Sequence, residues 1–510
     1  MLAQVLSAAL RGIDAFPVSV EVDVTFGLPV FAMVGLPDAS VRESRDRVRA
    51  AIRNSGFDFP PHRITVNLAP ADVRKAGAAF DLPIAVAILA AAGVVPDRDG
   101  RRLAIVGELS LDGAVLPTRG ILPVAAGLRR LGIEALVLPH ANAAEASVVA
   151  GLAVVPVRTL AEAVACLQQA ADAWPRPPLT PPLLPSADDS DGDLLDVRGQ
   201  ATARRALEVA AAGGHHLLFV GPPGAGKTML ARRLPGVLPP LTFEEALEAT
   251  AVHSVAGLLA PGVGLLGARP FRAPHHTASE AALVGGGSQP RPGDVTLAHH
   301  GVLFLDELPE FGRRVLESLR QPLEEGQVRI SRASGTVTFP AAFTLVAAMN
   351  PCPCGFAGQA ARVCRCTPLA VQQYYDRVSG PLRDRLDLTV ELAPVPFDAL
   401  TGGVSGEPSA AVRARVAAAR TRQRERTAPG VAGANSRLTP RALELVAALD
   451  DAAHRRLAAA ATRLHLSGRA VHRVLRVART VADLDASDRV LLPHLLEALQ
   501  FRATGPRGPS

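Results

Sequence analysis

The stretch HHLLFVGPPGAGKTMLARRL, residues 215–234, decides the fold of this chain. A short apolar run leads into Gly221–Thr228, which matches the phosphate-loop pattern G-x-x-x-x-G-K-[ST], and a segment with helical spacing follows. Glycines let backbone N–H groups close around phosphate oxygens, and the start of a helix adds positive potential. The full match in this setting predicts a strand, a phosphate-binding loop and a helix, and disfavours a Gly/Pro-rich turn without a ligand.

Two side chains of this loop predict specific chemistry. Lys227 would bring a compact charge to the β- and γ-phosphates, and the Thr228 hydroxyl would bind Mg²⁺. The chain has only one other lysine, Lys75, while its remaining 52 basic residues are arginines. We expect the nucleotide to be contacted by Gly221, Pro222, Pro223, Gly224, Ala225, Gly226, Lys227, Thr228 and Met229.

Two further apolar runs end in polar side chains. GVLFLDE (301–307) ends in Asp306 and Glu307. We expect Asp306 to hold Mg²⁺ through water, and Glu307 to act as general base on the attacking water. AFTLVAAMN (342–350) ends in Asn350, whose amide could orient that water. Because such runs are typical of strands buried on both faces, residues 194–395 are predicted to form an α/β core with a parallel sheet.

Arginines beyond these strands are candidates for phosphate contacts. Arg385, in SGPLRDRLDLTVEL (379–392), could be a finger inserted into a neighbouring subunit's nucleotide, and a surface salt bridge with Asp384 or Asp387 is the alternative. In the last segment, one of three arginines could reach back to the phosphates: Arg469, Arg473 or Arg476.

The overall composition excludes several classes of protein. The 510 residues are 48% apolar and 4% aromatic, with a net charge of +6. The longest nearly uncharged apolar stretch, Leu82–Pro96, is too short to span a bilayer, and the N-terminus lacks the features of a signal peptide. A membrane span, a secreted disulfide scaffold and a disordered chain are therefore disfavoured, and a soluble, multi-domain, cytoplasmic protein is expected.

Breaks in composition divide the chain. Residues 1–165 mix short strands and helices and are predicted to form an α+β domain. The Pro-rich and acidic stretch 166–193 is predicted to be a linker. Residues 396–436 could be a second linker or a helix, and residues 437–510 are predicted to be helical.

Four of the five cysteines form a C-x-C…C-x-C pattern: Cys352, Cys354, Cys364 and Cys366. Four thiolates could bind Zn²⁺ tetrahedrally, although one residue rather than the usual two separates each pair. Free thiols in a reducing cytosol and a redox pair are the alternatives. Cys166 is expected to be a lone, buried apolar residue.

Long motifs along the chain resemble those of the YifB/ComM family of magnesium-chelatase-like AAA+ ATPases. They include RPFRAPHHTASEAALVGGG (269–287), RPGDVTLAHHGVLFLDELPEF (291–311), LESLRQPLEEGQVRISRASGTVTFPAAFTLVAAMNPCPCG (316–355) and LSGRAVHRVLRVARTVADL (466–484). The resemblance covers nearly the whole chain. It implies an N-terminal Lon-protease-like (S5-like) α+β domain, an AAA+ P-loop α/β core and a C-terminal helical lid of the magnesium chelatase type.

The resemblance also implies a function. Better-studied family members are hexameric ring motors that use ATP and Mg²⁺ for DNA branch migration, and they help to integrate single-stranded DNA during natural transformation. By matching motif, the family's functional residues fall at Gly221–Thr228 (Walker A), Asp306 and Glu307 (Walker B), Asn350 (sensor 1), Arg385 (arginine finger), Arg469 (sensor 2, with Arg473 or Arg476 as alternatives), and Val197 and Gln200 (adenine).

Two arginines are expected to contact DNA. QVRISRASGTVTF (327–339) predicts a hairpin with its turn at Gly335, which in the family points into the ring pore, so Arg329 and Arg332 could contact phosphates there without reading sequence. PFRAPHHTAS (270–279) looks like a second pore insertion, whose two histidines we interpret as pore or structural residues. Residues 401–510 hold 18 arginines but nine acidic residues, which favours a polyanion partner or else a solvated helical face.

The N-terminal domain lacks the Ser–Lys dyad of true Lon-type proteases. Ala79, in KAGAAFDLP (75–83), stands where the serine would be, the lysine position falls near Val124, and Lys75 lies on a different element. We therefore expect no protease activity and a module that guides DNA or assembly. Two other functions remain open for the whole chain: a metal-insertion motor acting on porphyrin, and a DNA-binding scaffold that uses ATP only to assemble.

Overall fold

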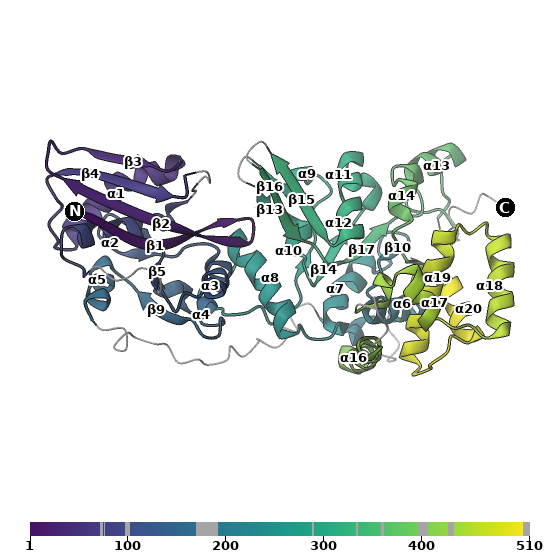
Figure 1. Cartoon of the computed structure of the whole chain (residues 1–510). Coiled ribbons are helices and arrows are strands. Elements are labelled where there is room, and N and C mark those ends of the chain that lie inside the picture. Colours follow the sequence, from purple (N-terminus) through teal and green to yellow (C-terminus); the bar gives the residue numbers. More distant parts are fainter. Residues whose placement is uncertain are drawn as a thin grey trace. The chain divides into compact units, whose positions relative to one another are not determined.

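A computed structural model of the chain describes residues 1–71, 75, 77–96, 103–169, 192–287, 290–332, 335–358, 362–395, 406–426 and 433–502 (Figure 1). Its contacts form two compact units. The N-terminal unit comprises Met1–Leu184 and Ala246–Leu266, and the C-terminal unit comprises Pro185–Glu245 and Gly267–Ser510. Residues 246–266 thus pack with the N-terminal unit, although the sequence places them inside the expected core.

The N-terminal unit is built on a seven-stranded mixed sheet with the order β3-β4-β2-β1-β5-β8-β9. β2 pairs antiparallel with both β1 and β4, and the other neighbours are parallel. The strands are β1 Leu2–Arg11, β2 Asp14–Thr25, β3 Phe31–Val34, β4 Arg63–Ala69, β5 Leu103–Ile105, β8 Ala135–Pro139 and β9 Ala153–Val157, with a separate hairpin of β6 Glu108–Leu109 and β7 Val115–Leu116. Alternate residues of β2, Val18, Val20 and Val22, are buried, as its alternating sequence predicts.

The helices of this unit are α1 Ala39–Asn54, α2 Asp81–Ala91, α3 Ile121–Arg130, α4 Ala143–Ala146, α5 Leu160–Gln168 and most of α8 Phe243–Ala256, with short 3₁₀ turns η1 Ala78–Phe80 and η2 His140–Asn142. Among them, α2 and α3 pack on β1 and β2 of that sheet. α2 is buried along almost its whole length, and every residue after its first, Asp81, is apolar. α5 continues through Gln168, so the first residues of the expected linker 166–193 are helical, and 170–191 lie outside the described residues. Cys166 on α5 is half-buried rather than buried.

The C-terminal unit contains a five-stranded, fully parallel sheet with the order β11-β14-β17-β10-β18. The strands are β10 Leu217–Val220, β11 Phe271–Arg272, β14 Val302–Leu305, β17 Thr344–Met349 and β18 Leu388–Glu391. β10, β14 and β17 are buried at every residue, as their apolar runs predict. Two small hairpins stand apart from this sheet: β12 Gly285–Gly286 with β13 Arg291–Pro292, and β15 Gln327–Arg332 with β16 Gly335–Pro340.

The helices of this unit are α6 Ala201–Gly213, α7 Lys227–Val237, α9 Glu280–Val284, α10 Asp294–Leu297, α11 Arg313–Ser318, α12 Arg320–Glu325, α13 Pro368–Asp376, α14 Gly380–Arg383, α16 Ser409–Glu425, α17 Pro440–Val446, α18 Asp451–Arg463, α19 Gly468–Leu484 and α20 Leu492–Gln500, with 3₁₀ turns η5 Leu194–Asp196, η6 Leu308–Glu310 and η7 Asn435–Arg437. Ser467 caps α19 by accepting from the Ala470 N–H. The segment 396–436, open between linker and helix, contains α16, while 396–405 and 427–432 lie outside the described residues.

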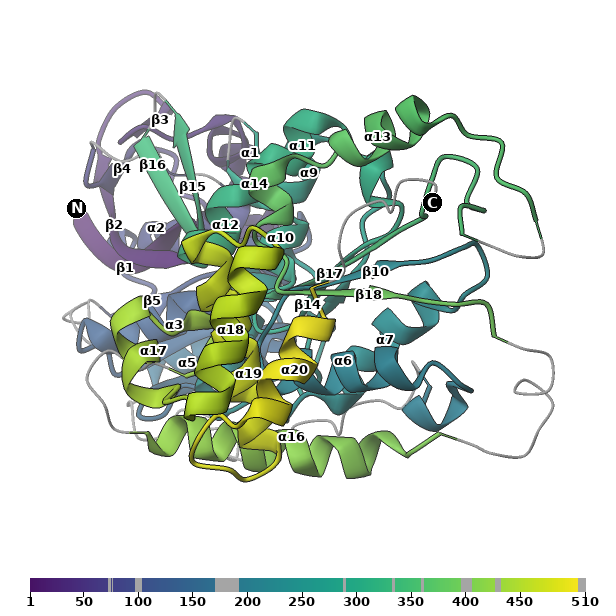
Figure 2. The same ribbon diagram turned by 90° about the vertical axis from the view of Figure 1, so that its right-hand side faces the viewer.

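One hydrophobic core joins the parallel sheet to the C-terminal helices. Figure 2 shows the ribbons of α6, α7, α19 and α20 together with that sheet. α6 packs against α7, α16 and α19, so helices that are distant in sequence share one layer. The Thr389 N–H on β18 donates to the carbonyl of Phe501 at 2.7 Å, which ties the end of α20 to the sheet edge. No helix in the described ranges is both long and apolar enough to cross a membrane.

Candidate nucleotide site

The candidate site lies where three neighbouring strands end. β10 leads into Gly221, β17 into Asn350 and β14 into Asp306, and these strands are adjacent and parallel in the order β14-β17-β10. The Gly221 N–H donates to the carbonyl of Met349 at 3.1 Å, which extends the β10–β17 pairing to the start of the loop. Parallel strands bring their carboxyl ends to one sheet edge, where ligands of such sheets bind. The structure therefore brings together the predicted loop, acids and amide.

The loop folds as the sequence predicts. Gly226 has φ +87° and immediately precedes α7, which begins at Lys227. A side chain would be strained in this left-handed conformation, so the position requires glycine. Lys227 Nζ donates to the carbonyls of Gly221 at 2.7 Å and Pro222 at 2.9 Å, which folds its ammonium back over the loop. The loop thus sets a cation and a helix N-terminus around one concave turn, as phosphate binding requires.

The polar side chains of the site are directly connected. Lys227 Nζ donates to Asn350 Oδ1 at 3.0 Å, and the Thr228 hydroxyl donates to Asp306 Oδ2 at 2.7 Å. Burial lowers the pKa of Lys227, and the charges of Asp306 and Glu307 oppose this shift. Thr228 and Asp306 could together hold a Mg²⁺ ion, because both offer oxygen ligands.

Glu307 is aimed by backbone conformation and by a residue that the sequence did not identify. It has φ +51°, its N–H donates to Asp306 Oδ1 at 3.0 Å, and its side chain is 55% exposed. His276 Nδ1 lies 3.3 Å from Glu307 Oε2. The sequence suggests a pore or structural role for this histidine, and the structure places it against the candidate general base. No sequence signal links the two residues, because they come from different loops.

The sequence predicts a second pore insertion over 270–279, and the structure corrects this prediction for the first residues of the segment, which belong to the core sheet. Phe271 and Arg272 form β11, which pairs with β14 at one edge of the core sheet. Arg272 also donates to Asp294 at 2.6 Å, so its guanidinium is paired within the same unit. Two residues are too few to show the periodicity of a strand, which explains why the sequence did not predict it.

Of the remaining residues that are expected to contact the nucleotide, one touches the phosphate loop and two pack in or against the core. Gln200 Nε2 donates to the carbonyls of Ala225 at 3.2 Å and Ala393 at 2.7 Å, so it touches the phosphate loop. Met229 is half-buried and packs against the core. Val197 is fully buried in that core and offers no exposed surface to a base.

Arg385 and Arg469 lie together in a cavity of about 860 Å³ within the C-terminal unit. We call it the arginine cavity, since it is lined by Arg269, Arg385, Arg420, Arg437, Arg469, Arg473 and Arg476. Among the described residues that line it, none comes from Gly221–Thr228. The three sensor 2 candidates, Arg469, Arg473 and Arg476, therefore line a cavity whose described lining does not include the phosphate loop of the same chain.

Several donors in the arginine cavity lack acceptors. Arg385 contacts Glu324 and donates to the carbonyl of Pro381 at 2.6 Å, and Arg473 lies 3.5 Å from Asp384. Buried N–H groups of Arg385 (Nε), Arg473 (Nη1) and Arg476 (Nε) have no hydrogen-bond partner within the described part of the chain. Buried donors without acceptors are costly, so a ligand with acceptor atoms would be favoured at these three N–H groups. The cavity as a whole has mixed charge, because it is also lined by Glu245, Glu324, Glu325, Asp384 and Asp387.

The predicted hairpin is formed by β15 and β16, with Arg332 paired to Gly335 across its end. Val328 and Ile330 are buried. Arg329 is exposed on the opposite face of β15, and Arg332 is exposed at the end of the strand, on the same face as Ile330. Both arginines are therefore accessible to a ligand.

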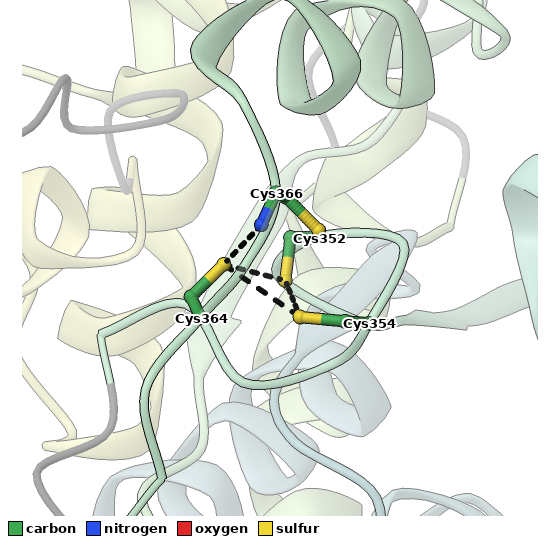
Figure 3. A group of neighbouring side chains, drawn as sticks. All are labelled: Cys352, Cys354, Cys364 and Cys366. Atoms are coloured by element: carbon green, nitrogen blue, oxygen red, sulfur yellow. Dashed lines mark hydrogen bonds between the residues drawn. The ribbon is translucent and has the colours of Figure 1, made fainter.

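The four clustered cysteines lie in the loop between β17 and α13 (Figure 3). Their Sγ atoms all lie within 4.8 Å of one another. Cys352 is fully buried, and the other three are half-buried. The Phe356 N–H lowers the pKa of Cys354 to about 6, whereas burial raises the pKa of Cys352.

The residues that correspond to a protease dyad lie on separate elements of the N-terminal unit. Ala79 lies in the short turn η1, and Val124 is buried in α3. Lys75 is fully buried and donates to the carbonyl of Pro70.

Family models match three parts of the chain. The model described as "Magnesium chelatase, subunit ChlI" covers residues 193–400, "Subunit ChlI of Mg-chelatase" covers 20–142, and "Magnesium chelatase, subunit ChlI C-terminal" covers 406–502. Together these cover most of both units. The central match contains the phosphate loop, both acids and Asn350.

Curated relatives match over almost the whole length. The chain is 45% identical over 505 residues to the uncharacterized protein YifB of Salmonella typhimurium, covering 98% of this chain and 97% of YifB. It is 44% identical over 511 residues to the competence protein ComM of Haemophilus influenzae, with the same coverage. A Lon protease of Chloroflexus aurantiacus is 32% identical over 155 residues, or 28% of this chain and 18% of that protease.

These matches agree with the sheet-edge site and with the two-unit architecture. The magnesium chelatase subunit to which the central model belongs is an AAA+ ATPase, and such enzymes use ATP with Mg²⁺. The chain belongs to the YifB/ComM family of magnesium-chelatase-like AAA+ ATPases.

Proposed function

We propose that this chain is a cytoplasmic, ATP-driven DNA motor that assembles as a homo-hexameric ring. It would promote branch migration or unwinding of DNA in recombination, including the integration of DNA during natural transformation. The observation that carries the proposal is the meeting of Lys227, Thr228, Asp306, Glu307 and Asn350 at one sheet edge. The name of the competence protein ComM supports a role with DNA.

Each residue of the site has a defined task in this proposal. Lys227 neutralises charge on the β- and γ-phosphates, while Thr228 and Asp306 hold Mg²⁺, which stabilises negative charge on the phosphates. Glu307 takes a proton from the attacking water as general base. Asn350, which already accepts from Lys227, orients that water beside the γ-phosphate.

The arginine cavity supports a nucleotide site shared between subunits. Arg385, Arg469 and Arg473 line a cavity whose described lining excludes the phosphate loop, and this supports a task for them at a nucleotide held by another copy of the chain. Two of them carry buried N–H donors that still need acceptors, as phosphate oxygens would provide. We therefore assign these arginines, including the sensor 2 candidate Arg469, to the neighbour's nucleotide. The C-terminal helices that carry Arg469 and Arg473 would act as the lid of that shared site.

DNA would contact the exposed side of the β15–β16 hairpin. Its two arginines, Arg329 and Arg332, are both exposed, and a guanidinium contacts phosphates through its charge. Such a surface binds phosphates without sequence preference. The N-terminal unit would guide DNA or assembly, without peptide hydrolysis.

One alternative function is a motor that inserts metal into porphyrin, and the family models named after magnesium chelatase favour it. The other alternative is a scaffold that binds DNA and uses ATP only for assembly.

A branch-migration assay distinguishes the motor from these alternatives. Purified protein is incubated with a synthetic four-way DNA junction and ATP, and branch migration is followed by gel electrophoresis. The motor requires migration with ATP and none with a non-hydrolysable analogue. Equal products with both nucleotides would favour the scaffold, and no products with either would contradict the proposal.

Lys227→Ala should weaken ATP binding about 10- to 100-fold, because a charge-assisted bond to phosphate contributes roughly 1.5–3 kcal/mol. Binding of a fluorescent ATP analogue with Mg²⁺ measures the effect. Arg232→Ala, an exposed cation on the same helix, is the matched control and should bind as wild type does. Unchanged binding by Lys227→Ala would show that the nucleotide lies elsewhere.

The double substitution Arg329→Ala/Arg332→Ala should weaken DNA binding uniformly across sequences and reduce the salt slope of log affinity by about 0.7 per lost phosphate contact on a single strand. Fluorescence anisotropy at several salt concentrations measures both quantities. Arg329→Lys/Arg332→Lys keeps the charges and should retain most of the affinity. A salt slope that does not change in the alanine variant would place the DNA on another surface.

A further inference from the structure

The loop between β17 and α13 holds four thiols in one small volume (Figure 3). Cys352 Sγ lies 3.3 Å from Cys354 Sγ and 3.7 Å from Cys364 Sγ, and the last two sulfurs are 3.6 Å apart. Cys366 completes a group in which every sulfur lies within 4.8 Å of the others. Four sulfur ligands therefore converge on a common centre.

The sulfur spacing fits a tetrahedral metal ion. Four Zn–S bonds of about 2.3 Å place neighbouring sulfurs about 3.8 Å apart, close to the distances in this cluster. N–H groups of Ala357, at 3.3 Å from Cys352 Sγ, and of Cys366, at 3.4 Å from Cys364 Sγ, point at the sulfurs. Such N–H donors stabilise thiolate charge around a bound metal.

The loop has little else to hold its shape. Among the described residues from 351 to 367, only Cys352 and Gly355 are buried. A segment of this length without an apolar core needs a cross-link to keep one conformation, and a metal ion with four thiolates supplies one.

The same loop meets the candidate nucleotide site at two places, at Asn350 just before the loop and at Gly355 within it. Cys352 follows two residues after Asn350, whose Oδ1 accepts from Lys227 and whose N–H donates to the Tyr374 hydroxyl at 3.4 Å. Gly355 has φ +84°, and a Cβ there would lie 2.8 Å from Pro223 Cδ of the phosphate loop. The loop therefore packs closely against that loop through a position that requires glycine.

We propose that Cys352, Cys354, Cys364 and Cys366 bind one Zn²⁺, and that this ion positions Asn350 by fixing the loop against Pro223. On binding, each coordinating thiol gives its proton to solvent, and no electron is transferred. The cysteines are positioning residues, since they reach the nucleotide only through Asn350 and Pro223. This second half of the inference rests on the proposed ATPase site, whereas zinc binding does not.

Metal content tests the first half on the intact protein. Full-length chain purified without chelator should contain about one zinc ion per chain by elemental analysis. Replacement by Co²⁺ should give thiolate-to-metal charge-transfer bands and the visible bands of a tetrahedral site. Cys354→Ser/Cys364→Ser should lose the metal, and Cys166→Ser, the matched control, should keep it. Less than about a tenth of an ion per chain, with the thiols free or oxidised, would overturn the site.

A double-mutant cycle tests the second half. Cys354→Ser/Cys364→Ser should lower the turnover number for ATP about 10-fold or more, as loss of support around a site does, with little change in ATP affinity. Asn350→Ala should lower it as well, and combining the changes should add little further loss, because both remove the same positioned amide. Fully additive losses would overturn the positioning role while the metal site stands. If the wild-type chain binds zinc but hydrolyses no ATP, the proposed function fails and the metal site remains.

Discussion

Replacing Arg385 by alanine is expected to slow ATP turnover by roughly 10³-fold, the scale of losing an arginine that stabilises the phosphoryl-transfer transition state. ATP binding by the same subunit should change little, because Arg385 lines the arginine cavity and not its own phosphate loop. Steady-state hydrolysis and fluorescent-nucleotide binding, measured on the same preparation, separate the two effects. Glu324→Ala is the matched control, since it removes the partner of Arg385 and keeps the guanidinium.

Subunit mixing shows whether Arg385 acts on a neighbour. Arg385→Ala subunits retain an intact phosphate loop, and Lys227→Ala subunits retain an intact Arg385. A mixed ring contains interfaces at which both intact groups meet, so part of the turnover should return when the two inactive proteins are combined. No recovery in rings proven to be mixed, together with loss of ATP binding by Arg385→Ala alone, would contradict a shared site.

Glu307→Gln should slow hydrolysis about 10²- to 10⁴-fold, because the amide cannot accept the proton of the attacking water. ATP binding and ring assembly should persist, since Lys227, Thr228 and Asp306 are unchanged and the side chain keeps its size. Hydrolysis, nucleotide binding and particle mass in solution measure the three properties. Branch migration should stop along with hydrolysis.

A nearby carboxylate serves as the control for Glu307→Gln. Glu310, three residues further on, is partly exposed and accepts from Arg377 at 2.9 Å, so Glu310→Gln should retain most of the turnover. If branch migration continued in Glu307→Gln at a rate near wild type, DNA movement would not depend on hydrolysis at this site. That outcome would leave the scaffold function.

Local patterns predicted most of the core of the C-terminal unit. The apolar runs before Gly221, Asp306 and Asn350 are strands, and their carboxyl ends meet because strands of a parallel sheet end at one edge. The hairpin that carries Arg329 is also present at its expected residues. In each case a short stretch of sequence contains the whole signal.

Features that depend on long-range packing were not predicted. Nothing in the sequence of α8 indicates that residues 246–266 pack with the N-terminal unit. β11 is too short to show a period, and His276 meets Glu307 only because two separate loops converge. The arginine cavity gathers residues from all along the C-terminal unit, so spacing on the helix of Arg469 could not show that this residue lines a cavity with Arg385.

The central claim is that ATP turnover at the Gly221–Thr228 loop is coupled to DNA. The most direct measurement is the hydrolysis rate of the wild-type chain with Mg²⁺, alone and with single-stranded, duplex or forked DNA at equal nucleotide concentration. The account predicts that at least one DNA raises the rate, and that Lys227→Ala abolishes the increase. A rate that none of the three DNAs changes would contradict the claim and favour the porphyrin alternative.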